Sequence, residues 1–62
     1  MKGTLHKGIL RGIADGPVLV VEVQGQEMAY PLDCDLKLEW IESHMGKTVT
    51  YLLDEGRAKQ VV

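Results

Sequence analysis

The sequence predicts a mainly β fold, namely a small barrel of five strands with one short helix between the third and fourth strands. Three observations predict it. Residues 17–32 have the pattern of a β-hairpin, alternating apolar residues return over 47–53, and only residues 36–45 repeat apolar residues every three or four positions. A chain of 62 residues has room for one small core, so residues 1–62 are expected to form a single domain.

The hairpin is the centre of the predicted fold. Its first strand, residues 18–24, is rich in valine, and Gly25-Gln26 is the expected turn before a second strand over 27–32. Pro31 has no amide hydrogen to donate, so it is expected at the end of that strand or on a sheet edge. The strand over residues 18–24 is apolar on both faces, which predicts that either the helix or another molecule covers its second face.

A long first strand is expected over residues 2–13, bent or bulged at Gly8. The alternative to a bend is that Lys7 and Arg11 lie at the rim, with their stems buried and their charged groups in water. The residues expected to face inward are Leu5, Ile9 and Ile13.

The predicted helix spans residues 36–45, with Asp35 as its N-cap and Gly46 ending it in a left-handed conformation. The fourth and fifth strands are expected over 47–53 and 58–62, joined by a type I turn with a bulge at residues 54–57.

This order of elements resembles the OB-fold, a five-stranded Greek-key barrel, and SH3-like barrels fit the strand count as well. The OB-fold resemblance implies binding of oligonucleotides or oligosaccharides on the second and third strands. The residues expected on that outer surface include no aromatic or basic side chain, and two are acidic. They are Val18, Val20, Glu22, Gln24, Glu27 and Ala29.

The charge distribution supports a second hypothesis, single-stranded nucleic-acid binding through the first strand. Residues 1–13 carry three bases and no acid, whereas the rest of the chain carries nine acids and four bases. A basic strand can contact phosphates, although such charges also commonly solvate a surface or pair with acids. The residues of this hypothesis are Lys2, His6, Lys7 and Arg11.

No residue pattern predicts catalysis, a metal or a cofactor, and the chain is expected not to be an enzyme. His6, Cys34 and His44 match no zinc spacing. Cys34 lies between two aspartates, which disfavour its thiolate. One cysteine, a basic N-terminal stretch and no long apolar segment predict a cytoplasmic protein that does not enter a membrane.

The leading functional hypothesis is a non-enzymatic interaction module that binds another protein or itself, as in a symmetric homodimer. Its basis is an excess of apolar residues expected to face away from the core. Trp40 is included because tryptophan often anchors interfaces, although it can instead seal the bottom of the barrel. The predicted interface residues are Leu10, Val18, Val20, Ala29, Trp40 and Leu52.

Overall fold

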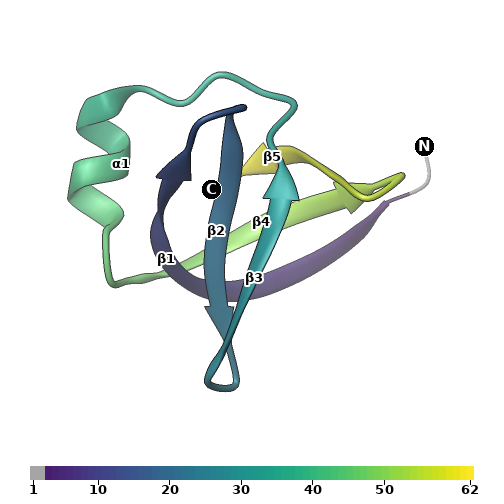
Figure 1. Ribbon diagram of the computed structural model, residues 1–62, viewed down its shortest axis with the longest axis horizontal. Coiled ribbons are helices and arrows are strands. Elements are labelled where there is room, and N and C mark those ends of the chain that lie inside the picture. Colours follow the sequence, from purple (N-terminus) through teal and green to yellow (C-terminus); the bar gives the residue numbers. More distant parts are fainter. Residues whose placement is uncertain (1–2) are drawn as a thin grey trace.

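A computed structural model describes residues 3–62 and contains five strands and one helix in the predicted order (Figure 1). Short turns join the first three strands to one another and the last two strands to each other, and the helix lies in the longer connection between the third and fourth strands. The elements are β1 (Thr4–Ala14), β2 (Val18–Val23), β3 (Gln26–Pro31), α1 (Leu38–His44), β4 (Thr48–Asp54) and β5 (Arg57–Val61).

The strands form one sheet in the order β3-β2-β1-β4-β5, and every neighbouring pair is antiparallel. Three consecutive strands are followed by a fourth that returns beside the first, which is Greek-key topology. The edge strands β3 and β5 meet only just beyond the end of β3, through a parallel bridge between Leu32 and Ala58. The amide of Asp33 also donates to the Ala58 carbonyl at 2.8 Å. This confirms the mainly β fold, but the pairing does not close the sheet into a barrel.

The core lies on the inner face of the curved sheet. Tyr51, on the central part of β4, is its largest fully buried side chain. Each strand except β3 contributes fully buried or nearly buried residues, and β3 adds Tyr30 against them. The cluster of buried side chains is Leu10, Leu19, Val21, Val49, Tyr51, Ala58 and Val61.

The orientation predicted for the first half of β1 is wrong. Leu10 is fully buried whereas Leu5 is 70% exposed. The strand shifts register between Leu10 and Gly12, not at Gly8, and this shift lets Ile13 pack against the core. At Gly8 a Cβ atom would come within 3.1 Å of the Val23 side chain, so this glycine permits close packing of β1 on β2.

The helix is shorter than predicted. It begins after Lys37, which is the N-cap and makes no side-chain capping hydrogen bond, so the prediction of Asp35 as N-cap is wrong. The predicted left-handed glycine is confirmed at Gly46, with a φ of 76°. Through Trp40 and Ile41, α1 packs against the core beside β1, and it leaves the outer face of β2 uncovered (Figure 1).

Both tight turns differ from the prediction. The first consists of Gln24 and Gly25, one residue earlier than expected, with φ values of 52° and 80°. The second consists of Glu55 and Gly56, with φ values of 55° and 74°. Positive φ at both central residues defines type I′ turns, whose twist matches that of the flanking strands. The predicted end of the third strand at Pro31 is confirmed.

Candidate protein-interaction surface

The β2–β3 hairpin has one continuous register from its turn to its base. Val23 lies opposite Gln26 beside the turn, and Val18 lies opposite Pro31 at the base. In a hairpin with a two-residue turn, the residues flanking the turn exchange backbone hydrogen bonds. The pairs beyond them are alternately without and with such bonds. The amide of Leu32 donates to the Pro17 carbonyl at 3.0 Å, which is the bond this alternation requires at the far end.

The two faces of this hairpin differ in what they contact. On the inner face, Leu19 and Val21 are fully buried and Tyr30 packs against them. On the outer face, Val18 and Val20 are half-buried and lie outside the core cluster. The register places Ala29 opposite Val20, and both Ala29 and Pro31 are exposed. The outer face therefore carries a small apolar surface, which we call the hairpin face: Val18, Val20, Ala29 and Pro31.

Two residues predicted to face outward as interface residues are buried. Leu10 is fully buried because the alternation of β1 places it, and not Leu5, on the inner face. Leu52 does lie on the outer face, between Leu5 and Gln60, yet only 9% of it is exposed. Neither side chain can anchor a partner without movement of its neighbours.

Trp40 is half-buried and packs against the core, and its ring stacks on that of His44 with centroids 4.1 Å apart. His44 Nδ1 is also hydrogen bonded to the Trp40 carbonyl, at 2.8 Å. These contacts hold Trp40 within the helix and against the sheet, which agrees with the alternative of a seal at one end of the core.

The free edge of β3 was not singled out by the sequence. Gln26, Met28 and Tyr30 exchange backbone bonds with β2, so the backbone groups of Glu27 and Ala29 point to the other side. Among residues 3–62, no strand pairs with β3 on that side before the bridge at Leu32. Two features of the sequence indicate this edge. Pro31 is typical of an edge strand, and a two-residue turn determines which residues of β3 form backbone hydrogen bonds with β2.

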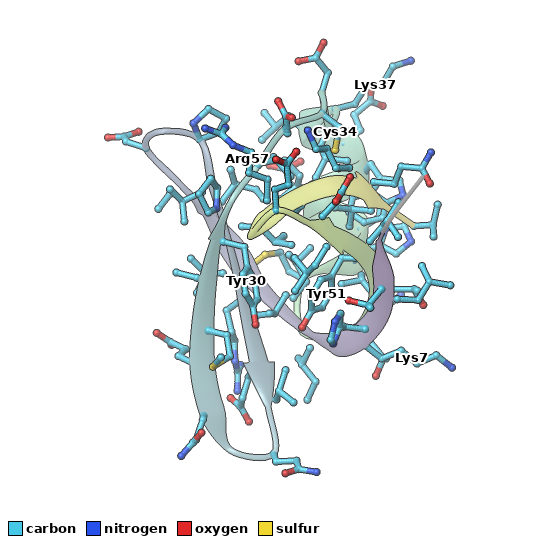
Figure 2. All side chains as sticks on the ribbon, turned by 90° about the vertical axis from the view of Figure 1, so that its right-hand side faces the viewer. Lys7, Tyr30, Cys34, Lys37, Tyr51 and Arg57 are labelled. Carbon is cyan, nitrogen blue, oxygen red and sulfur yellow. The ribbon has the colours of Figure 1, made fainter. Side chains whose placement is uncertain are left out.

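An aromatic group lies on the inner face next to this edge. The rings of Tyr30 and Tyr51 are 5.7 Å apart, and His6 stacks on Tyr51 at 5.8 Å. Figure 2 shows the two tyrosines side by side between the hairpin and the rest of the sheet. Burial, followed by the nearby Tyr30 hydroxyl, raises the pKa of Tyr51, so its phenol stays neutral at physiological pH.

The residues of the nucleic-acid hypothesis do not form one basic surface. His6 shares the inner face with Tyr51, whereas Lys7 points away from it to the outside (Figure 2). Arg11 forms an ion pair with Glu22 on the neighbouring strand. Lys2 lies outside the described residues.

A shallow depression of about 320 Å³ lies beside Cys34, where the segment after β3 passes the turn at Pro17. Burial raises the pKa of the Cys34 thiol, and Asp35 and Asp33 raise it further, so the thiol is protonated at neutral pH. Asp33 is paired with Lys59 at 2.6 Å. Within the described part of the chain, no three His, Cys, Asp or Glu side chains gather as metal ligands.

The comparisons with known proteins name no relative. No protein-family model, no curated protein and no solved structure matches this chain. Across residues 3–62, no helix is long and apolar enough to cross a membrane.

Proposed function

We propose that this protein is a non-enzymatic interaction module that binds a protein surface, either its own or that of a partner, through the β2–β3 hairpin. The observation that carries the proposal is the hairpin face, where Val18 and Val20 lie outside the core and beside exposed Ala29. β-branched residues on an outer sheet face gain free energy when another surface removes them from water.

The proposed architecture behind this function is a partly open barrel of the OB type. Its support is the Greek-key order together with the approach of the two edge strands at Leu32 and Ala58. We further propose a cytoplasmic location, because the chain has a single cysteine, Cys34, and therefore cannot form an internal disulfide.

The test compares one substitution on the hairpin face with one on another strand. Val20→Lys places a charge at the centre of the hairpin face, and Thr48→Lys places the same charge at an exposed position of β4. We expect the unmodified chain to show a mass above that of a monomer, or to capture a specific protein. We also expect the Val20→Lys variant to lose this association and the Thr48→Lys variant to keep it.

A monomer at every concentration that captures no protein would contradict the proposal, as would equal association by both variants. Light scattering after size exclusion measures the mass in solution, and affinity capture with each purified variant measures binding to a partner protein. A short single-stranded oligonucleotide serves as a separate arm. Binding that weakens with salt and is lost in Lys7→Ala would favour the nucleic-acid hypothesis instead.

A further inference from the structure

We propose that the partner is a second copy of this chain, which pairs edge to edge through β3 in an antiparallel arrangement with Met28 on the two-fold axis. This inference rests on the proposed function and names its partner. The two β3 strands then join the two sheets into one, so the binding element is the row of backbone groups along the edge of the hairpin.

The edge of β3 is open where the pairing requires it. Glu27 and Ala29 are exposed, and 38% of Met28 is exposed between them. The turn end of the hairpin projects beyond the rest of the sheet in both views (Figures 1 and 2). The helix lies beside β1, away from this edge. A second strand can therefore approach without displacing another element.

The edge has few of the features that usually prevent such pairing. Edge strands commonly carry charged side chains, proline, a bulge or a covering segment, and of these β3 itself has Glu27 and Pro31. The register of β2 with β3 shows no shift, and no lysine lies between Gln26 and Pro31. Pro31 cannot donate, but it stands at the end of the strand beside the Leu32–Ala58 bridge. It limits the length of the pairing and leaves Glu27 and Ala29 available.

The backbone identifies the occupant as an extended strand, since only another strand presents donors and acceptors at the spacing of Glu27 and Ala29. A second β3 satisfies this need and matches the side chains on both faces. Met28 of the second copy then lies on the inner side, where the first copy has Met28 and Tyr30. The small Ala29 of the second copy lies on the outer side, where the first copy has Glu27.

Charge and the position of Pro31 select the register. Centring the pair on Glu27 would place two carboxylates directly opposite each other, which is unfavourable. Centring it on Ala29 would place Glu27 opposite Pro31, which has no amide hydrogen and lies at the bridge to β5. Centring it on Met28 places Glu27 opposite the partner copy's alanine, and the amides and carbonyls of both residues are then satisfied in each copy.

This register places the hairpin faces of the two copies on the same outer side of the paired sheets. Val20 of each copy lies opposite Ala29, and Ala29 lies opposite Glu27 of the other copy, so the two Glu27–alanine pairs separate the two hairpin faces. Val18 and Val20 of both copies therefore remain half-buried on one face of the dimer, outside the β3–β3 contact.

Disulfide trapping tests the register. Directly opposed residues in a pair that does not exchange hydrogen bonds have Cα atoms about 4.5 Å apart, within the range of about 4.4–6.8 Å for a disulfide. In a Cys34→Ser background, Met28→Cys is expected to form a covalent dimer under mild oxidation. Leu38→Cys, on the exposed side of α1, is the control and is expected to remain monomeric.

A pair of substitutions at Ala29 tests the charge. Ala29→Glu places a carboxylate opposite Glu27 of the other copy, and Ala29→Lys places an ammonium group there. We expect the dissociation constant of the dimer to rise about tenfold for Ala29→Glu, since the pair occurs twice, and to stay equal or fall for Ala29→Lys. Sedimentation equilibrium measures both, and circular dichroism verifies that each variant is folded.

Three outcomes would overturn the inference: a chain that is monomeric at all accessible concentrations, trapping through Ala29→Cys in place of Met28→Cys, or equal effects of the two Ala29 substitutions. A monomeric chain that still captures a partner protein, and loses it in Val20→Lys, would overturn the pairing of two copies while leaving the proposed function intact.

Discussion

At the scale of single residues, Gln24 has an unfavourable backbone conformation for its type. Its φ is 52°, and it precedes Gly25 in the turn of the β2–β3 hairpin. A residue with a Cβ atom has a higher energy in the left-handed region than glycine, and asparagine tolerates that region better than most other residues. Type I′ turns accordingly favour Asn-Gly.

The substitution Gln24→Asn is therefore expected to increase the free energy of unfolding by about 0.5–1 kcal/mol. Urea denaturation at a concentration that keeps the chain monomeric measures the change. Gln26→Asn is the matched control because Gln26 is exposed and lies in the strand, where asparagine brings no gain. An equal effect of both substitutions would show that the turn is not the source.

At the scale of elements, β1 shows how the two faces of one strand differ in their contribution to stability. Leu10 is fully buried, while Leu5 on the same strand is 70% exposed. Composition does not separate these two leucines. What separates them is the pairing of β1, which places His6, Gly8 and Leu10 on the inner face with Tyr51.

Leu10→Ala is expected to lower the free energy of unfolding by about 2–5 kcal/mol, because it removes buried side-chain atoms and leaves a cavity. That is a large fraction of the roughly 5 kcal/mol at the lower end of the range for small domains. Leu5→Ala is expected to change it by less than about 0.5 kcal/mol. Thermal and urea denaturation compare the two variants. A larger loss of stability in Leu5→Ala than in Leu10→Ala would show that β1 has the opposite orientation, with Leu5 inside.

At the scale of the whole molecule, the two edges of the sheet are held together over a short stretch. Asp33, just after β3, contacts β5 through its amide and through its carboxylate, which pairs with Lys59. The hydrogen bond and the charge of Lys59 lower the pKa of Asp33, and those of Asp33 raise the pKa of Lys59. Both side chains are partly exposed, so solvent screens the pair and its contribution is small.

The sign of the pH dependence follows from these shifts. Because the folded pKa of Asp33 lies below its ordinary value of 3.8, its contribution is present above that pH and is lost as pH falls through the folded pKa. Because the folded pKa of Lys59 lies above 10.5, its contribution is present below that pH and is lost as pH rises through the folded pKa.

A double-mutant cycle with Asp33→Asn and Lys59→Met tests this. The coupling free energy between the two residues, measured by urea denaturation, is expected to be favourable at neutral pH and to vanish in acid. The double variant cancels effects that belong to each residue alone. A coupling energy that stays the same in acid would show that the charges do not interact.

Much of the fold could be predicted because its signals are local. The valine-rich run, the alternation after Lys47 and the three-to-four spacing around Ile41 depend only on residues close in sequence. Less of the candidate surface could be predicted. Val18, Val20 and Ala29 lie on the outer face, whereas Leu10 and Leu52 are buried and the open edge at Glu27 was missed.

The sequence by itself determined the kinds of element, their order and the end of β3 at Pro31, since hydrophobic periodicity and proline act within one segment. The tertiary structure decided which leucine of β1 is inside, where that strand shifts register, and which backbone groups of β3 have no partner. These features depend on pairing between segments distant in sequence. A shift of one residue in that pairing reverses the face of every side chain in the strand.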